Sequence, residues 1–199
     1  MRFPERGLHA SWSFWLLILL AAIVSPITIV LSILLAAALH ECGHLLALRA
    51  FHVPIEGLRL SAFGAVLHAR GAQRLSYGRE LVVTLAGCGM NLVCGVLTAW
   101  FSLHYVWVEG FVFAGAHILL CAFNLLPIPP LDGSSIIVPF LKGKALANYY
   151  RLQQYAMPIL IIVLYLLPMW TGIDVIGRYF DVTVYPLAEQ LLNFAIAGI

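Results

Sequence analysis

The chain has 199 residues, of which 62% are hydrophobic and 10% are charged, and its net charge is +2 at pH 7. A soluble domain is about half apolar and about a quarter charged, so this composition excludes an ordinary soluble protein and indicates an integral membrane protein. The few basic residues form no cluster of the kind that follows a phosphate backbone, which argues against nucleic acid as a partner. The four cysteines lie in apolar stretches without a C-x-x-C pair, so they predict neither a disulfide framework nor a cysteine zinc site.

The first two predicted elements form a membrane hairpin. Residues 12–24 are an apolar run that follows Arg2 and Arg6. Alone this run resembles a signal peptide, but a second long apolar run begins directly after Ser25 and Pro26. We therefore interpret the pair as two spans with Pro26 at the turn. The second run, 27–51, is long enough for a bilayer that needs about 20 apolar residues, whereas the first is short.

The second run contains the stretch His40-Glu41-Cys42-Gly43-His44. Side chains four residues apart lie on one face of a helix, so His40 and His44 can direct two imidazoles at one metal ion, with Glu41 beside them. This is the HExxH arrangement, in which two histidines hold zinc and the glutamate acts on water. Such groups cost about 2.5–3.5 kcal/mol each in a membrane helix, which favours function over a histidine pair bonded to neighbouring helices. Cys42 faces away and is not expected to be a ligand.

Residues 52–79 differ in character from the apolar runs. Pro54 and several glycines interrupt this segment, and alternating stretches such as 57–61 favour strands. We expect a β-hairpin or re-entrant segment that lies over the metal helix or at the membrane surface, because non-helical backbone at membrane depth must be shielded. Two roles remain open, a structural cover of the site or an exposed strand edge that pairs with an extended substrate.

A third span is predicted at about 80–102 and a fourth at about 110–126, joined by a short connection without Lys or Arg. The third span contains Ala86, Gly87 and Asn91. Small residues at this spacing allow close helix packing, and Asn91 places a polar group in the middle of an apolar helix. An interhelical hydrogen bond is one explanation for that asparagine.

The fourth span ends in the stretch 124–133, which contains three prolines within four residues. Prolines at this density cannot continue a helix, so a non-helical segment carries the carboxylate of Asp132 to a fixed place. Asp132 is the natural third metal ligand, because catalytic zinc sites usually take three protein ligands and leave the fourth position to water. The alternative is that Asp132 caps the helix that follows.

The C-terminal part is expected to contain a fifth span at about 152–170, and we interpret 171–199 as a sixth crossing rather than an interfacial helix. The predicted fold class is an all-α polytopic membrane protein of about six transmembrane helices, with the small β segment after the second. The whole chain, 1–199, is predicted to be a single domain. With these spans every Lys and Arg except Arg178 falls on one side, which the positive-inside rule makes cytosolic. The His-Glu-His group and Asp132 approach from that side.

These residues resemble the site-2 proteases, a family of intramembrane zinc metalloproteases of regulated proteolysis. The stretch 40–44 is similar to the family's HExxH helix, and 124–133 is similar to its N-x-x-P-x-x-x-L-D-G segment, which carries the third ligand. Ala86-Gly87 followed by Asn91 resembles a weaker third signature, an A-G-P-x-x-N element. The resemblance covers about residues 10–145, and the C-terminal helices at about 152–199 lie beyond it.

Three positions depart from the family pattern. Cys42 stands where Leu is usual, Cys88 where Pro is usual, and Ser134 in place of a common second glycine. None of these changes removes a ligand or the base. The small chain is more similar to the branch of the sporulation protease that matures a mother-cell sigma factor, but it is expected to differ from that enzyme in lacking a C-terminal cystathionine-β-synthase-like (CBS) domain.

The resemblance implies a zinc endopeptidase in the cell membrane, with one Zn²⁺ held by His40, His44 and Asp132 and with Glu41 as general base and then general acid. It also implies Asn124 and Asn91 as substrate or oxyanion contacts, for which helix-packing amides are the alternative. The expected partners are the lipid bilayer and a membrane-bound protein substrate such as a sigma-factor precursor or an anti-sigma factor. A homo-oligomer is also compatible with the sequence.

Two other classes of function compete with the protease. A non-cutting membrane-protein binder, a pseudoprotease, is expected to have lost Glu41 or a ligand, and all four residues are present. A metal transporter is expected to show repeated halves with a broken helix in each, and only one broken segment is visible. Four further histidines lack a partner at ligand spacing and are expected to be structural, namely His52, His68, His104 and His117.

Overall fold

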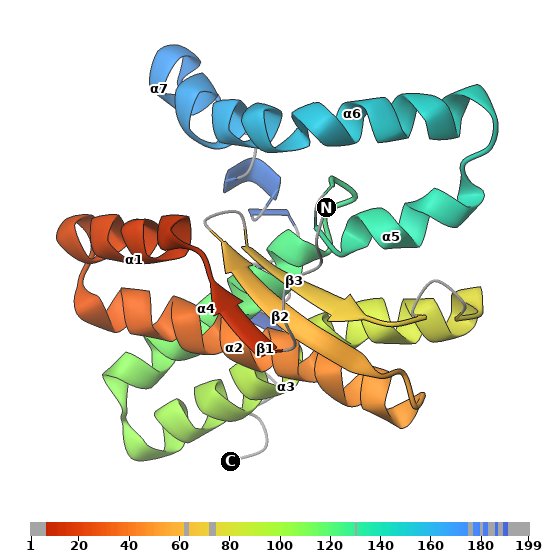
Figure 1. The fold of residues 1–199 in the computed structure, drawn as a ribbon. Helices are drawn as coiled ribbons and strands as arrows, with labels where there is room; N and C mark the ends of the chain where they lie inside the picture. The colour runs from red at the N-terminus through yellow and green to blue at the C-terminus, as the bar shows by residue number, and fades with distance from the viewer. Residues whose placement is uncertain are drawn as a thin grey trace.

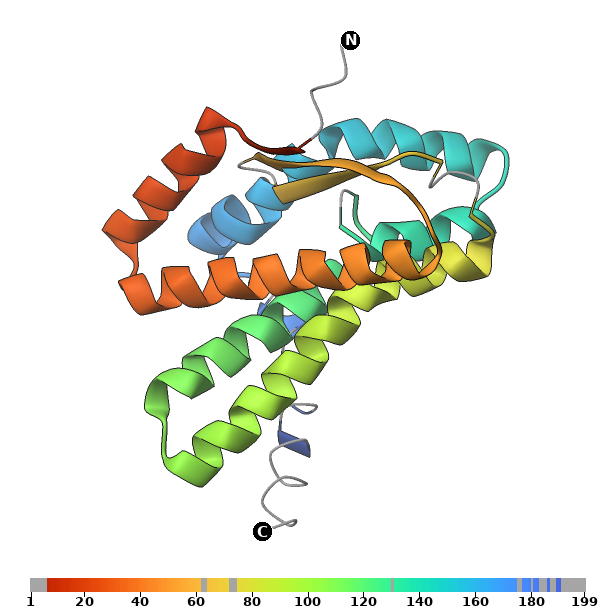
Figure 2. The same cartoon turned by 60° about the horizontal axis from the view of Figure 1, so that its bottom comes forward.

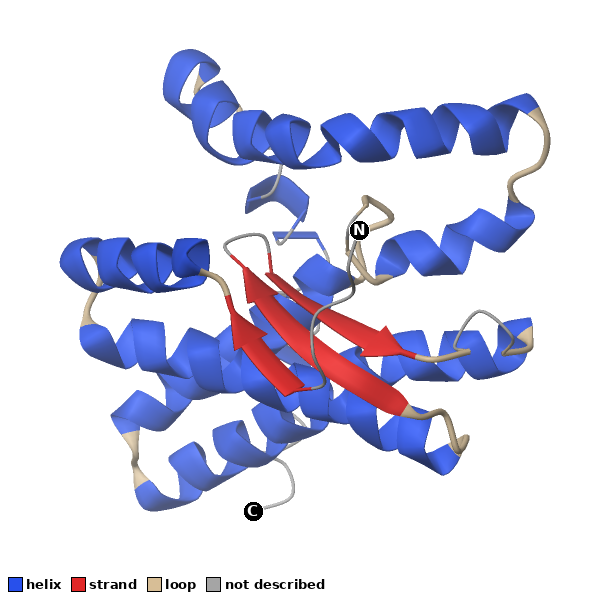
Figure 3. Cartoon of the chain, viewed as in Figure 1, coloured by secondary structure: helices blue, strands red, loops and turns tan. Residues whose placement is uncertain are grey.

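The computed structural model describes residues 7–61, 64–71, 75–129, 131–174, 177–179, 181–182, 186 and 189–190. This part of the chain is mostly helical and carries one small sheet (Figures 1 and 3). The helices are α1 (Trp12–Val24), α2 (Ile27–Ala50), α3 (Tyr77–Tyr105), α4 (Val108–Asn124), α5 (Gly133–Ile137), α6 (Lys144–Ile161) and α7 (Leu167–Thr171). A 3₁₀ turn, η2 (Val138–Phe140), follows α5, and a π-helical turn, η3 (Ile162–Leu166), joins α6 to α7. The strands are β1 (Gly7–Ala10), β2 (Ile55–Ser61) and β3 (Gly64–Ala69).

Helices α1 and α2 form the predicted hairpin, with Ser25 and Pro26 between them. None of the residues of α1 is buried, and α2 exposes large apolar side chains such as Leu31 and Leu35, at 57% and 50%. Apolar surface of this extent on a soluble monomer is unusual, whereas lipid tolerates it. Both α2 and α3 are long and apolar enough to cross a membrane, and α1 and α4 are shorter apolar helices. These features indicate a membrane protein.

Helix α3 packs against both α2 and α4, and Figure 2 shows these helices on one side of α2. Glycines lie at the contacts. A Cβ built on Gly43 of α2 would collide with the backbone oxygen of Ala86 in α3, and a Cβ on Gly95 of α3 would come 3.2 Å from the Cβ of His117 in α4. The prediction that small residues of the third span allow close packing is therefore confirmed. This packing brings the middle of α3 into contact with the histidines of α2.

The small sheet lies across the opposite side of α2 (Figure 2). Strands β2 and β3 form the predicted antiparallel hairpin, in which Leu58 pairs with Leu67. Strand β1 adds to this hairpin in parallel with β2, from Gly7 opposite Gly57 to Ala10 opposite Leu60. The sequence did not predict β1, because a strand of four residues shows little alternation and its partner lies far along the chain. The sheet order β1-β2-β3 leaves β3 at one edge.

The helix that corresponds to the predicted fifth span begins earlier in the sequence than that span. Helix α6 starts at Lys144 rather than near 152, because Lys144, Asn148 and Arg151 interrupt the stretch 144–151, so that a search for apolar runs passes over it. It continues through η3 and α7 to Thr171, close to the predicted end at 170. Most of the expected sixth crossing, 171–199, lies outside the described residues, and a total of six spans stays a prediction. Arg2, Arg6 and Arg74, three of the charges used for the orientation, also lie outside the described part.

Candidate metal centre

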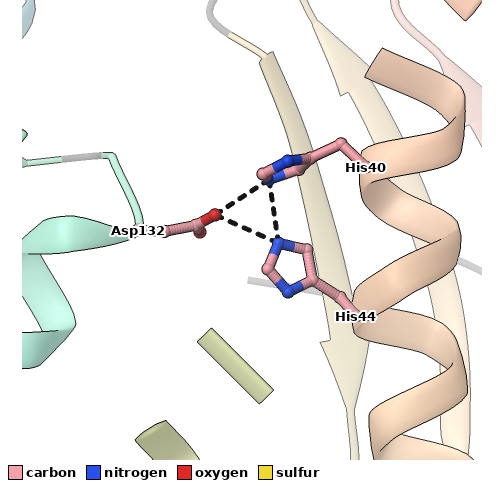
Figure 4. Close-up of side chains that lie close together, drawn as sticks. All are labelled: His40, His44 and Asp132. Carbon is pink, nitrogen blue, oxygen red and sulfur yellow. Dashed lines mark hydrogen bonds and ion pairs between the residues drawn. The ribbon is translucent and has the colours of Figure 1, made fainter. Parts of the chain in front are cut away.

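His40 and His44 project from one face of α2, as their spacing predicted (Figure 4). Both side chains are buried, and their Nε2 atoms lie 3.0 Å apart. The rings meet edge to face with 4.7 Å between their centroids. Two imidazole nitrogens at this separation point at a common position rather than at separate partners.

Asp132 reaches the two histidines from the segment that follows α4 (Figure 4). Its Oδ2 lies 2.8 Å from Nε2 of His40 and 3.1 Å from Nε2 of His44. The preceding segment is non-helical, as the prolines predicted, and its apolar side chains Leu126 and Leu131 are buried together. The side chain of Asp132 makes no capping hydrogen bond to α5, so its oxygen is directed at the histidines and not at the helix that it precedes.

The three side chains fit a metal ion. Ligand atoms of a tetrahedral zinc site lie about 3.3 Å apart when the bonds are about 2.0–2.1 Å, and two histidines with one carboxylate are a known catalytic zinc set. The separations of 2.8, 3.0 and 3.1 Å come near that value. Space beside the nitrogens is provided by Gly87 of α3, since a Cβ there would come 2.5 Å from Nε2 of His44 and 2.7 Å from Nε2 of His40. His40, His44 and Asp132 thus form one group that could hold a metal ion.

Helix α3 orients the ring of His44. The Nδ1–H of His44 donates a hydrogen bond of 2.8 Å to the backbone oxygen of Val83. This bond fixes the tautomer in which Nε2 keeps its lone pair, which is the usual arrangement behind a metal-bound histidine. The orientation of His44 therefore suits a ligand as well as its position does.

The carboxyl group of Asp132 is strongly acidic. Burial alone would raise the pKa of Asp132, but the hydrogen bond with His40 and the charge interactions with both histidines outweigh it and lower that pKa to about 2. The aspartate is therefore an ionised oxygen donor at neutral pH. Cys42, by contrast, is exposed and stands apart from this group, as expected for a residue on the other face of the helix.

Glu41 lines a cavity of about 320 Å³ together with His44 and Asp132. One wall is the face of β3 formed by Ala65, Leu67 and Ala69, and another is the first two turns of α3. A pocket of this size is at the lower end of those that take small ligands or short peptide segments. The structure thus places Glu41, two members of the metal group and one face of the edge strand β3 around one space.

The two asparagines lie in different surroundings. Asn91 is fully buried behind His40, with its Nδ2 3.2 Å from Nδ1 of His40 and its Oδ1 3.0 Å from Nδ1 of His117. This is the interhelical hydrogen bond that the sequence allowed. Asn124 donates to the backbone oxygen of Leu120 in its own helix, at 3.0 Å. Roles of either residue in substrate or oxyanion binding stay predictions.

His117 was missed as a neighbour of the site. The sequence analysis assigned it a structural role because it lacks a partner at ligand spacing on its own helix, yet the structure connects it to His40 through Asn91. A signal was present on α3, where Gly87, Asn91 and Gly95 recur every four residues and so share one face. That pattern marks the helix face on which both histidine-bearing helices converge.

Comparison with known proteins gives a match at the level of the fold. No family model matches the sequence, and no curated protein matches it. Among solved structures, a site-2 protease from Methanocaldococcus jannaschii matches with a TM-score of 0.63 and 20% sequence identity, over 96% of this chain and 94% of that chain. The chain has the fold of a site-2 protease. The predicted resemblance is thus supported at the level of the fold, whereas the sporulation branch stays an expectation.

Proposed function

We propose that this chain is an intramembrane zinc metalloprotease of the site-2 protease type, which hydrolyses peptide bonds in or near transmembrane segments of membrane-bound regulatory proteins. The observation that carries the proposal is the convergence of His40, His44 and Asp132 within 3.1 Å of one another, with Glu41 lining the same cavity. Its support from outside the chain is the fold shared with the archaeal site-2 protease.

Each site residue then has a role. His40, His44 and Asp132 would hold the zinc ion, which would supply a Lewis acid that polarises the scissile carbonyl and lowers the pKa of water toward about 7. Glu41 accepts the proton of the attacking water and returns it to the leaving amine. Val83 keeps the ring of His44 in its ligating tautomer through the bond to Nδ1. Asn124 and Asn91 are the candidates for contacts to the substrate or the oxyanion.

The substrate is expected to bind in an extended form along β3. A helix hides its peptide bonds in its own hydrogen bonds, so a transmembrane substrate must unwind before it is cut. Among the described strands β3 pairs with β2 alone, and alternate residues of β3 face the cavity. Addition of a substrate strand to this edge would hold the unwound chain beside the metal group.

The distribution of Lys and Arg along the chain predicts the orientation of the protein in the membrane. We propose a multi-pass protein of the cell membrane whose 199 residues act as one catalytic domain, with the site reached from the cytosolic side. A membrane-bound sigma-factor precursor or anti-sigma factor is the expected kind of substrate. Glu41 within the cavity argues against a non-cutting binder, and the fold of a site-2 protease argues against a transporter built from repeated halves.

The decisive experiment compares the termini of membrane proteins in cells that carry the wild type with those in cells that carry Glu41→Gln at matched expression. New N-termini inside or beside membrane spans, present only with Glu41, would establish the protease and identify its substrates. Zinc content is measured on both purified proteins, because the substitution should leave the metal bound. Identical sets of termini from two zinc-loaded proteins would refute the protease and favour the binder or the transporter.

A further inference from the structure

One face of α3 organises the site from behind. Gly87, Asn91 and Gly95 lie four residues apart, and each meets a histidine of another helix: Gly87 meets His40 and His44, Asn91 meets His40, and Gly95 meets His117. The ring of His117 is held further by Phe113, which contacts it edge to face at a centroid distance of 4.5 Å. Three helices thus place one asparagine between two imidazoles.

The buried polar side chains of Asn91 and His117 are costly in free energy, which suggests that they serve the site. Asn91 and His117 have no exposed surface, and polar groups within membrane helices are expensive unless they are hydrogen-bonded. The Nδ1 of His117 is bonded to Asn91, but its Nε2 has no hydrogen-bond partner among the described residues. An apolar residue at position 117 would avoid that cost, so the imidazole calls for a reason beyond packing.

We propose that His117 and Asn91 form a hydrogen-bond chain that positions His40 as a metal ligand, and that the direction of every hydrogen bond in this chain reverses when a metal binds. His117 acts through Asn91 and is a positioning residue. The inference rests on the proposed metal site but not on the proposed proteolysis. It concerns residues that lie on the opposite side of His40 from Asp132.

The direction of the chain follows from the tautomer of His40. In the structure the Nδ2 of Asn91 donates to Nδ1 of His40, and Nδ1–H of His117 donates to Oδ1 of Asn91. The Nε2 of His40 then carries the proton and donates to Asp132. A metal at Nε2 requires the other neutral tautomer, with the proton on Nδ1, and that proton needs an acceptor.

A rotation of the Asn91 side-chain amide by about 180° supplies an acceptor for the proton on Nδ1 of His40. Its Oδ1 then faces Nδ1–H of His40, and its Nδ2 faces His117, whose Nδ1 must now accept and whose proton must lie on Nε2. Each ring keeps one proton, and both hydrogen bonds are retained with donor and acceptor exchanged. An imidazole nitrogen can take either part, whereas a backbone N–H or carbonyl cannot. This explains why a histidine, rather than a backbone group, ends the chain.

Zinc affinity of the purified full-length protein tests the positioning role, with Zn²⁺ competed against a chelator of known affinity. Asn91→Leu removes the acceptor for His40 and should weaken zinc binding by about 10- to 100-fold, the usual effect of losing a partner of a ligating histidine. His117→Phe should weaken it toward the lower end of that range. Asn91→Asp should keep affinity near that of the wild type, because a carboxylate accepts from both histidines.

A double-mutant comparison separates this chain from packing. If His117 acts only through Asn91, Asn91→Leu with His117→Phe should bind zinc as weakly as Asn91→Leu alone. Phe113→Leu is the matched control, since it changes the contacts of the His117 ring without removing a hydrogen bond, and it should bind zinc like the wild type. His117→Gln, which keeps a donor and an acceptor, covers the case in which the phenylalanine variant does not fold.

Histidine-selective ¹⁵N spectra test the reversal. His117 should carry its proton on Nδ1 without zinc and on Nε2 with zinc. The same His117 tautomer in both states would overturn the reversal. Wild-type zinc affinity in both His117→Phe and His117→Gln, or an equal loss in Phe113→Leu, would overturn the positioning role and leave the proposed protease intact. A wild-type protein that binds no zinc would overturn both proposals.

Discussion

Gly87 of α3 lies against His44 of α2 so closely that a Cβ on the glycine would come 2.5 Å from Nε2 of the histidine. That nitrogen is the proposed ligand atom, so the missing side chain of Gly87 is part of the site. A helix that crossed α2 with any other residue here would fill the space next to the ligand nitrogens.

Gly87→Ala should therefore abolish metal binding while the protein still inserts and purifies, because the added methyl group lies beside both ligand nitrogens. Metal content by mass spectrometry should fall to about a tenth of the wild-type value or less, in line with the 10- to 100-fold losses that disturbed zinc sites show. Gly89→Ala is the control on the same helix, since a Cβ there meets nothing within 4 Å. Full metal content in Gly87→Ala would place the ion elsewhere.

Asp132→Ala should lower the zinc content of the purified protein, because it removes the only carboxylate in the described group. Two histidines alone leave zinc one protein ligand short of the usual catalytic set. Asp174→Ala serves as the comparison, since that aspartate is exposed and bonds the backbone N–H of Gly177 instead. Unchanged zinc after the loss of Asp132 would mean that another residue supplies the third ligand.

Ala65→Trp should block the substrate without disturbing the metal. Ala65 lines the cavity from β3, so a large ring there occupies the space that an extended peptide needs. Cleavage of a membrane substrate should fall at least tenfold, with zinc affinity unchanged. Val66→Trp is the matched control, because Val66 is 53% exposed on the other face of the same strand. Equal cleavage by the two variants would remove the strand from substrate binding.

Cysteine labelling tests the orientation in the membrane. Lys142→Cys should be protected from an impermeant thiol reagent in intact cells and react after lysis, whereas Glu109→Cys should react in intact cells, because the two positions are predicted on opposite sides. The exposed Cys42 is first replaced by serine to remove its background. The reverse pattern would place the site on the outer side of the membrane.

The metal group was predictable from the sequence because local rules determine it. The spacing of His40 and His44 fixes their common face, and the prolines before Asp132 exclude a helix, so each residue carries its own geometric signal. The hairpin of β2 and β3 was predictable for the same reason, since its strands alternate and are neighbours in the chain.

The rest required knowledge of which helices and strands meet. His117 bonds Asn91 across two helices, and β1 pairs with a strand about 50 residues later. The segments that contain His117 and β1 show no periodic signal of these contacts. The start of α6 at Lys144 was missed because Lys144, Asn148 and Arg151 interrupt the apolar character of its first two turns. Long-range pairing, rather than local propensity, determined these features.

The ligands come from distant parts of the chain, because Asp132 meets a histidine that lies 92 positions earlier. An ion held by this set ties the segment between α4 and α5 to α2, and it closes a long loop that includes β2, β3, α3 and α4. Closure of so long a loop is entropically costly, and metal binding supplies free energy against that cost. The ion would then stabilise the fold in addition to its role in catalysis. Removal of the metal with a chelator should make the segment 125–143 susceptible to added proteases before the rest of the protein.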